Sequence, residues 1–261
     1  MPYHLVRQPI LRPARTFVDF AGVFRPGPSE PPRVPTHAAA PGGDNGPGIG
    51  RREPALATYL IDLSPQDMRR RLGEALSVYV DAMRYPRGTE DNRASMWLEH
   101  TRRNGWKAVA AVEATDGTDP AALADAPLLG VAYGYCGAPD HWWQQQVVQG
   151  LHRAGLADAE ISRLTSSYFE LTELHIRPDA QGNGLGEALT RRLLDNREEA
   201  LVLLSTPEVN GEGNRAWRLY RRLGFGDVIR DYHFAGDPRP FAVLGRALPL
   251  SVPVPGVDLA R

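Results

Sequence analysis

The stretch Phe169-Glu-Leu-Thr-Glu-Leu-His-Ile-Arg-Pro-Asp-Ala-Gln-Gly-Asn-Gly-Leu-Gly-Glu-Ala-Leu189 decides the fold. Its first eight residues predict a strand over 169–176, which Pro178 ends. Residues 184–194 place leucine and alanine at helical spacing and predict an amphipathic helix. Between the two, residues 181–186 predict a glycine-rich turn that leads the strand into the helix.

This turn predicts a binding site for an anion. The first N–H groups of a helix have no partner within the helix, and the helix dipole favours negative charge at that end. Glycine residues let a phosphate approach the backbone closely. The expected ligand is therefore the diphosphate of a nucleotide-like cofactor.

Three classes of cofactor compete for such a turn. A P-loop ends in Gly-Lys-Ser/Thr, which is absent here. A dinucleotide fingerprint needs Gly-x-Gly-x-x-Gly and an acidic residue at the end of the next strand. Here Gly182, Gly184 and Gly186 alternate, and the next strand, at 201–205, ends without an acid. Coenzyme A remains, since its pantetheine arm hydrogen-bonds along a strand edge.

A second motif is Asn214-Arg-Ala-Trp-Arg-Leu-Tyr-Arg-Arg-Leu-Gly-Phe225, which follows a short apolar strand expected at 200–204. It predicts a helix over 214–223 that Gly224 ends. The two motifs, in this order, resemble the acyl-CoA signatures of the GNAT acetyltransferase superfamily. In the order of its elements the resemblance covers about residues 58–248.

The resemblance implies an α/β fold with a mixed, mostly antiparallel central sheet and helices on both faces. One parallel pair of strands should splay apart at the cofactor site. The implied activity is transfer of an acetyl group from acetyl-CoA to a primary amine. Direct attack in a ternary complex is expected, because no activated nucleophile for an acyl-enzyme is evident. The acceptor should be a small-molecule or peptide amine.

The resemblance also implies which residues hold the cofactor. In the family, backbone N–H groups of the strand before the turn bind the pantetheine and polarise the thioester carbonyl, and the turn binds the diphosphate. The implied set is Leu174, His175, Ile176, Gln181, Gly182, Asn183, Gly184, Leu185, Gly186, Asn214 and Tyr220. No metal site is expected.

Amine acetylation needs a group that takes a proton from an ammonium of pKa about 10, and a donor for the leaving thiolate. The resemblance assigns the donor to Tyr220. Glu170 lies eleven residues before Gln181, as the catalytic glutamate does in the histone acetyltransferase branch, and is the preferred base. Glu173 is the second candidate, expected on the opposite face of the strand because side chains alternate. His175 should share the face of Glu173.

The remaining segments predict further strands and helices. Ser64, Pro65 and Asp67 form a helix start with a capping box. Further strands are expected at 57–63, 106–114, 128–136, 228–234 and 241–248, and further helices from 65 to Pro86 and at 93–103.

Residues 1–54 hold 11 of the 23 prolines and 7 of the 26 glycines. Such a segment buries too little apolar surface to offset the entropy of ordering, so a disordered or loosely docked extension is expected. Residues 55–261 should form the N-acetyltransferase domain. An insert at about 138–167 stands where the family usually has a short hairpin. Trp142 and Trp143 within this insert predict an anchor to the core more readily than a lid over the acceptor.

Charge and composition exclude several classes of function. The 30 basic and 31 acidic residues nearly cancel, which argues against nucleic-acid binding. No apolar run approaches the roughly 18 residues that cross a bilayer, and residues 1–20 lack a signal-peptide core. Cys136 is the one cysteine, which excludes an intrachain disulfide. With Lys107 as the only lysine, the arginine-rich composition fits a GC-rich bacterial genome, and a cytoplasmic protein, with a homodimer as a possible assembly, is expected.

Two rival functions would keep part of this pattern. A non-catalytic acyl-CoA-binding regulatory module would need the glycine turn but would be indifferent to Tyr220, Glu170 and Glu173. A dinucleotide-binding oxidoreductase would bind NADH in place of acetyl-CoA.

Overall fold

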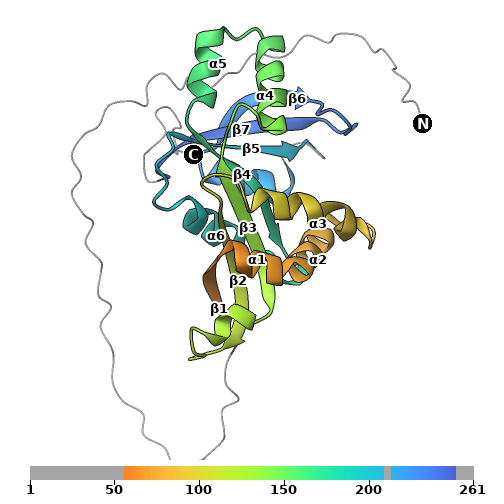
Figure 1. Ribbon diagram of the computed structural model, residues 1–261, viewed down its shortest axis with the longest axis vertical. Coiled ribbons are helices and arrows are strands. Elements are labelled where there is room, and N and C mark those ends of the chain that lie inside the picture. The colour runs from red at the N-terminus through yellow and green to blue at the C-terminus, as the bar shows by residue number, and fades with distance from the viewer. Residues whose placement is uncertain (1–55, 209–212, 251–261) are drawn as a thin grey trace, which may run out of the picture.

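The computed structural model describes residues 56–208 and 213–250, and the extension predicted at 1–54 lies outside them. The strands are β1 (Leu56–Leu63), β2 (Lys107–Thr115), β3 (Leu128–Cys136), β4 (Tyr168–Ile176), β5 (Leu201–Pro207), β6 (Gly226–Tyr232) and β7 (Phe241–Ala247). They form one sheet in the order β1-β2-β3-β4-β5-β7-β6 (Figure 1). Of the neighbouring pairs, only β4 and β5 run parallel, so the predicted mixed, mostly antiparallel sheet is confirmed.

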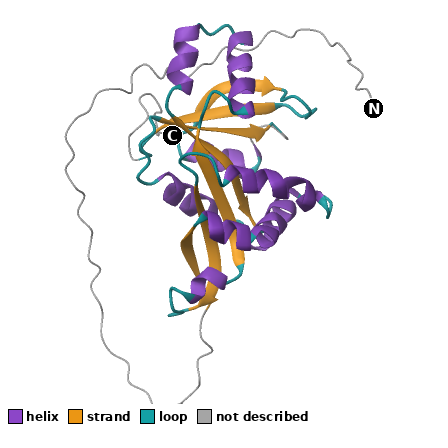
Figure 2. Cartoon of the chain, in the orientation of Figure 1, coloured by secondary structure: helices purple, strands orange, loops and turns teal. Residues whose placement is uncertain are grey.

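The helices cover both faces of this sheet (Figure 2). They are α1 (Pro65–Arg70), α2 (Leu72–Met83), α3 (Thr89–His100), α4 (Trp142–Arg153), α5 (Asp158–Thr165), α6 (Leu185–Leu194) and α7 (Arg215–Arg222), with short 3-10 turns η2 (Ala122–Asp125) and η3 (Pro178–Ala180). On one face α6 and α7 pack on a core that includes Phe169 and Leu204. On the other face α1–α3 cover the half around Tyr133, and α4 and α5 cover the half around Leu203.

Local signals decide where the first helices begin and end. The backbone N–H of Asp67 donates to Ser64 Oγ, and the N–H of Ser64 donates to Asp67 Oδ2, each at 3.1 Å, which is the predicted capping box. The helix then leaves helical geometry at Arg71 (φ −100°, ψ 12°), so α1 and α2 stand where one helix was predicted. The left-handed Arg84 ends α2 ahead of Pro86.

A bulge in β4 decides which way its acidic side chains point. Consecutive residues of β3 pair with Glu173 and with Leu171, so Thr172 is an extra residue in β4. One extra residue reverses the alternation of faces along a strand. Glu170 and Glu173 therefore lie on the same face of the sheet, and the prediction that they lie on opposite faces is wrong.

The predicted insert between β3 and β4 consists of α4 and α5, which stand apart from α1–α3 at the top of the view in Figure 1. Trp143 Nε1 donates to Ser205 Oγ on β5 at 3.2 Å, and the hydroxyl of Tyr168 on β4 donates to Oε1 of the buried Gln144 at 3.0 Å. Trp142 is 51% exposed. Trp143 is therefore an anchor as predicted, and the half-exposed Trp142 packs with one side on the buried Phe234, at 5.9 Å between ring centroids.

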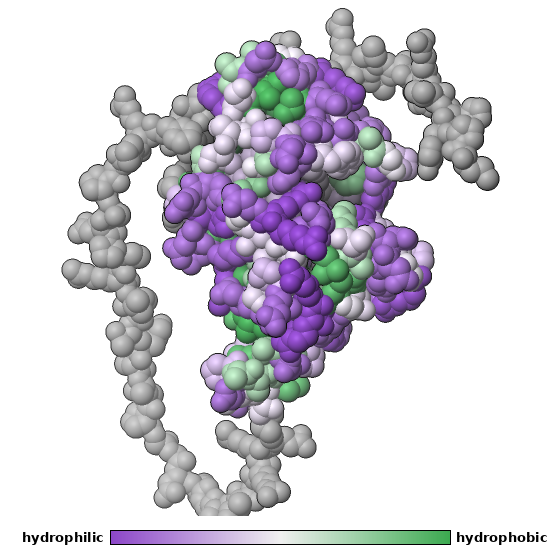
Figure 3. Space-filling view, in the orientation of Figure 1, coloured by the Kyte–Doolittle hydropathy of each residue, from purple (hydrophilic) through white to green (hydrophobic). Residues whose placement is uncertain are grey.

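Within the part of the chain that the structure describes, no helix is long and apolar enough to cross a bilayer. The face drawn in Figure 3 mixes hydrophilic and hydrophobic residues, with hydrophilic ones covering most of it.

We expect Gly134→Ala to destabilise the protein by about 2 kcal/mol or more, as overpacking does in cores. A Cβ at Gly134 would lie 2.1 Å from the carbonyl oxygen of Glu170 and 2.5 Å from the ring of Phe169, and the backbone next to the bulge would have to move. Chemical denaturation measures the change. The matched control is Gly73→Ala, because Gly73 is exposed in α2 with open space around its Cβ, and this change should be neutral or stabilising. An unchanged midpoint for Gly134→Ala would contradict the close approach of β3 and β4.

Candidate active site

The glycine-rich turn joins β4 to α6 and leaves its backbone accessible. Gly182 (φ 93°) and Gly184 (φ 78°) take left-handed conformations that favour glycine. A Cβ on either residue would meet no atom within 4 Å, so the turn has open space beside it. Gly184 gives α6 no side-chain cap, so the first N–H groups of the helix, from Leu185 onward, stay available to an anion. Gly186 is small for another reason, since a Cβ there would lie 3.1 Å from Leu219 Cδ2 on α7.

Gln181 ties the two sequence motifs together. Its Nε2 donates to the carbonyl of Ile176 at 3.0 Å, and its Oε1 accepts from Arg215 Nη1 at 2.9 Å. Arg215 is the first residue of α7, and Asn214 caps this helix by accepting from the N–H of Trp217 at 2.9 Å. The end of β4, the turn and the start of α7 are therefore held as one unit. Within the turn, the side chain of the remaining predicted residue, Asn183, donates back to the carbonyl of Ala180 at 3.4 Å.

Strands β4 and β5 separate soon after they meet. They pair only through residues 168–170 of β4, and the predicted splay of the parallel pair is confirmed. The N–H of Arg177 donates to the carbonyl of Leu129 on β3 at 2.9 Å. Along a strand, the N–H and C=O groups of successive residues point in alternating directions. Since the N–H of Arg177 points to β3, the backbone groups of Leu174 and Ile176 point away from β3, to the side from which β5 has diverged. The strand edge predicted to bind pantetheine is thus the edge that β5 leaves.

Glu173 and His175 form a hydrogen-bonded pair on the face covered by α2 and α3. Glu173 Oε2 lies 2.5 Å from His175 Nε2, and both side chains are mostly buried. The imidazole ring lies 5.0 Å from the ring of Tyr79 and 6.4 Å from that of Trp97. His175 therefore shares the face of Glu173, as predicted, and its side chain points toward the helices.

Tyr220 is buried on α7, in the core on the opposite face of the sheet. Its ring lies 5.5 Å from that of Phe225, and its hydroxyl makes no hydrogen bond to any residue that the structure describes. Burial raises the pKa of Tyr220, and the negative charge of Glu173 raises it further. The carboxylate of Glu173 is therefore within electrostatic reach of this hydroxyl, although the two residues come from opposite faces.

Glu170 occupies a different environment. It is 3% exposed, its Oε1 accepts from the hydroxyl of Tyr135 at 3.0 Å, and its Oε2 is buried with no partner in the described residues. Burial raises the pKa of Glu170 to about 7, and the bond from Tyr135 and the charge of Arg103 oppose that rise. Of the two carboxylates predicted as bases, only Glu173 affects the pKa of Tyr220.

Sequence reasoning missed the aromatic side chains around the Glu173–His175 pair. Tyr79 from α2 lies 5.9 Å from Trp97 of α3, which lies 5.0 Å from Tyr133 of β3, measured between ring centroids. The helical periodicity of α2 marked Tyr79 as a core residue. No sequence signal shows that α2, α3 and β4 converge at this pair, because the convergence is tertiary.

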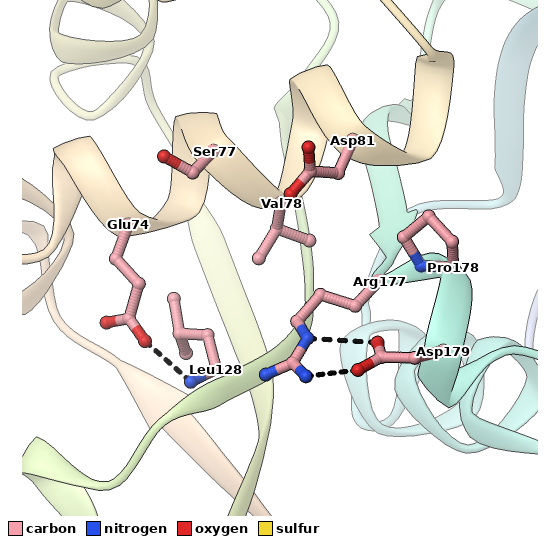
Figure 4. A pocket seen from close by; sticks show the side chains of 8 residues that line it. All are labelled: Glu74, Ser77, Val78, Asp81, Leu128, Arg177, Pro178 and Asp179. Carbon is pink, nitrogen blue, oxygen red and sulfur yellow. Dashed lines mark hydrogen bonds and ion pairs between the residues drawn. The ribbon is translucent and has the colours of Figure 1, made fainter.

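A cavity of about 530 Å³ lies between α2 and the start of η3 (Figure 4). Its lining residues are Glu74, Ser77, Val78, Asp81, Leu128, Arg177, Pro178 and Asp179. Some of its polar lining groups already have partners, since the N–H of Leu128 donates to Glu74 Oε1 at 2.7 Å and Arg177 pairs with Asp179. None of the predicted catalytic or cofactor residues lines this cavity.

Cys136 lies outside the candidate site. Its thiol donates to Glu199 Oε1 at 3.0 Å, and burial raises its pKa, so the thiol is a poor nucleophile at neutral pH. Residues 56–208 and 213–250 contain no group of three or more His, Cys, Asp or Glu side chains placed to hold a metal ion.

Comparison with known proteins gives the family. The profile of the Acetyltransferase (GNAT) family matches residues 126–225, which contain both motifs. The chain is 68% identical over 206 residues to the GCN5-like protein acetyltransferase Rv2170 of Mycobacterium tuberculosis, with 75% of this chain and 100% of that protein covered. It is 32% identical over 99 residues to the [ribosomal protein bS18]-alanine N-acetyltransferase of Escherichia coli K12, with 37% and 66% covered. Arabidopsis thaliana NAA60, solved with acetyl-CoA, matches with a TM-score of 0.47 and 16% identity over 74% of this chain and 99% of that one.

The splayed parallel pair and the glycine turn that opens α6 define an α/β protein with an open strand edge beside the uncapped start of a helix. The chain belongs to the GNAT acetyltransferase family. It is therefore an enzyme of the acyltransferase class, from a family that uses acetyl-CoA, and the resemblance seen in the sequence is confirmed.

We expect Glu170→Gln to stabilise the protein above pH 7. The folded pKa of about 7 lies above the ordinary value of 4.5, so the folded state binds this proton more tightly than the unfolded chain does. The stability contributed by the group is complete below pH 4.5 and is lost as the pH rises through 7. Glutamine keeps the shape and the acceptor for Tyr135 without the charge. The gain should rise from near zero at low pH to the order of 3 kcal/mol at pH 8.

Chemical denaturation at several values between pH 4.5 and pH 8 measures this gain. The matched control is Glu99→Gln, because Glu99 is exposed on α3 and pairs only with the exposed Arg102. A difference between Glu170→Gln and the wild type that does not change with pH would show that burial leaves the pKa of Glu170 near its ordinary value.

Proposed function

We propose that the protein transfers the acetyl group of acetyl-CoA to a lysine side chain of a protein or peptide, by direct attack within a ternary complex. The observation that carries the proposal is the divergence of β4 from β5 beside the open glycine turn, which leaves a strand edge and the uncapped start of α6 side by side. The printed name of the 68% identical relative, a protein acetyltransferase, supports a protein amine as the acceptor.

In this proposal acetyl-CoA binds along β4 and the turn. The N–H groups of residues 182–186 face the diphosphate, helped by the dipole of α6. Leu174 and Ile176 offer backbone groups to the pantetheine, and a strand N–H also stabilises the oxyanion that forms when the amine attacks the thioester. Coenzyme A supplies the activated acetyl group. Asn214 contributes indirectly, because it caps the helix that carries Tyr220.

Glu173 and Tyr220 then divide the proton transfers. Glu173 takes a proton from the ammonium, and its hydrogen bond with His175 holds the carboxylate in position. The raised pKa of Tyr220 keeps its hydroxyl protonated at neutral pH, so it holds a proton that it can give to the departing thiolate. We assign the role of base to Glu173, not to the initially preferred Glu170, because Glu170 is enclosed and hydrogen-bonded to Tyr135.

Each of the two rival functions makes an expectation that can be compared with the fold. A dinucleotide-binding oxidoreductase of the doubly wound type has a mostly parallel sheet, whereas only β4 and β5 are parallel here. A regulatory acyl-CoA-binding module would share the fold and the turn, but membership of an acetyltransferase family and a 68% identical relative that is named an acetyltransferase favour an enzyme.

We expect acetyl-CoA to raise the melting temperature of the wild type and to show a single site in calorimetric titration, because a ligand that binds only the folded state stabilises it. Gly184→Glu should abolish this binding by adding a negative charge at the turn. The matched control is Gly117→Glu, which adds the same side chain at nearly the same backbone angle (φ 79° against 78°), again with no atom within 4 Å, in the loop after β2. Equal binding by the two variants would remove the turn from the cofactor site.

We expect Tyr220→Phe to lower kcat about 100-fold with an unchanged Kd for acetyl-CoA, because general acid catalysis contributes that much or more. The assay follows thiol release with a lysine peptide blocked at its N-terminus. Tyr232→Phe is the matched control, since Tyr232 is equally buried (6% exposed) but lies on β6. If Tyr220→Phe turns over at the wild-type rate, Tyr220 is not the acid.

A further inference from the structure

A second group of titratable side chains lies between the sheet and the helical insert, and the proposed mechanism does not use it. Glu170 is its buried carboxylate, with Oε1 bound by Tyr135 and Oε2 unpartnered among the described residues. His141 supplies a second such atom, because its Nδ1 is also buried and unpartnered. The rings of His141 and Tyr135 lie 5.5 Å apart, edge to face. Tyr135 thus contacts both Glu170 and His141, two of the four described residues that have a buried polar atom without a partner.

His141 stands at the boundary between this cluster and solvent. It is the N-cap residue of α4, and the residue as a whole is partly exposed although its Nδ1 is buried. Burial lowers the pKa of His141, and the positive charge of Arg103 lowers it further, so the ring is neutral at neutral pH. A neutral imidazole holds a proton on one nitrogen and accepts one on the other.

The charges that face Glu170 come from three elements. Arg103, after α3, lies 4.5 Å from the centre of the Tyr135 ring and lowers the pKa of Glu170, whereas Glu173 on β4 raises it. His100 on α3 has a pKa of about 3 because it is buried, so it is neutral. On the insert side the hydroxyl of Tyr168 is committed to Gln144. These neighbours leave Glu170 able to bind and release a proton near neutral pH.

The reaction creates a need for such a group. An ammonium and acetyl-CoA give an amide, coenzyme A as the thiol, and one proton. The ammonium loses two protons: one balances the thiolate through Tyr220, and the other must reach solvent. The side chain of Glu173, which receives the proton first, is only 13% exposed, and that of its partner His175 is 9% exposed. A route from the site to solvent would therefore serve every turnover.

We propose that Glu170, Tyr135 and His141 form a proton relay from the active site to solvent on the side of the insert. Glu170 receives the proton from Glu173, which lies on the same face of β4. Tyr135 takes this proton and passes its own through a water to Nδ1 of His141, a buried atom with no direct partner among the described residues. His141 then releases a proton from Nε2, and no bond other than N–H and O–H bonds changes. The inference rests on the proposed function, because a relay matters only to an enzyme that turns over.

The test uses His141→Ala in the full chain, with acetyl-CoA and the blocked lysine peptide at low buffer concentration. We expect kcat to fall about tenfold, KM for acetyl-CoA to stay unchanged, and added imidazole to restore kcat by replacing the missing ring. The matched control is His152→Ala on the same helix, since His152 is exposed and approaches only Asp158. It should match the wild type with and without imidazole.

A second variant breaks the relay one step earlier and leaves the aromatic packing in place. Tyr135→Phe keeps the ring that packs against His100 and His141 but removes the hydroxyl. Its kcat should also fall, and imidazole should not restore it, because the break lies on the inner side of His141. A merely structural role for either residue would not produce this difference in rescue.

The outcomes separate the two proposals. Wild-type kcat in both variants, or a loss in His141→Ala that imidazole never reverses, would overturn the relay and leave the proposed function standing. Failure of the wild type to acetylate the lysine peptide would overturn the proposed function, and the relay with it.

Discussion

The separation of β4 from β5 after three paired residues is the constraint on which the active site depends. Buried backbone N–H and C=O groups need hydrogen-bond partners. Where a neighbouring strand diverges inside a protein, side chains, water or a ligand must supply these partners. The side chain of Gln181 is one such partner, since it donates a hydrogen bond to the carbonyl of Ile176. The rest of the edge is free for the extended arm of a cofactor. In the proposed mechanism, the same separation lets Glu173 and Tyr220, which come from opposite faces, act on one bound cofactor.

The local part of this arrangement could be predicted from the sequence. Glycine at positive φ, Asn214 at a helix start and Pro178 after a strand each act within a few residues, so the turn and its flanking elements followed directly. The faces of the acidic residues did not follow. Residues 169–176 contain nothing that marks Thr172 as an extra residue, because the bulge is a property of the pairing with β3. The sequence shows only the small Gly134 on the opposite strand, where a side chain would clash.

The choice between two carboxylates illustrates the same limit. The spacing of eleven residues before Gln181 favoured Glu170 as the base. Such a spacing does not show whether the side chain is buried. In the structure Glu170 has a tyrosine partner and a raised pKa, whereas Glu173 has a histidine partner and acts on Tyr220. Two acids on one strand and one face thus occupy environments that suit different tasks, a division common in acid–base enzymes. Tertiary contacts from α3, β3 and the insert create this division, and none of them is a sequence neighbour.

The insert both destabilises the fold, by enclosing Glu170, and stabilises it, by burying apolar side chains. The first turn of α4 contributes Gln144 to Tyr168, and His141 caps the helix beside Tyr135, so the helix encloses the side chains that surround Glu170. Enclosing a carboxylate disfavours its charged form, which destabilises the fold at neutral pH. Val147, Leu151 and their neighbours on the same helix offset this by burying apolar surface against β5–β7. A segment that only closed the core would not need to cover Glu170 as well, and the proposed relay gives this enclosed acid a role.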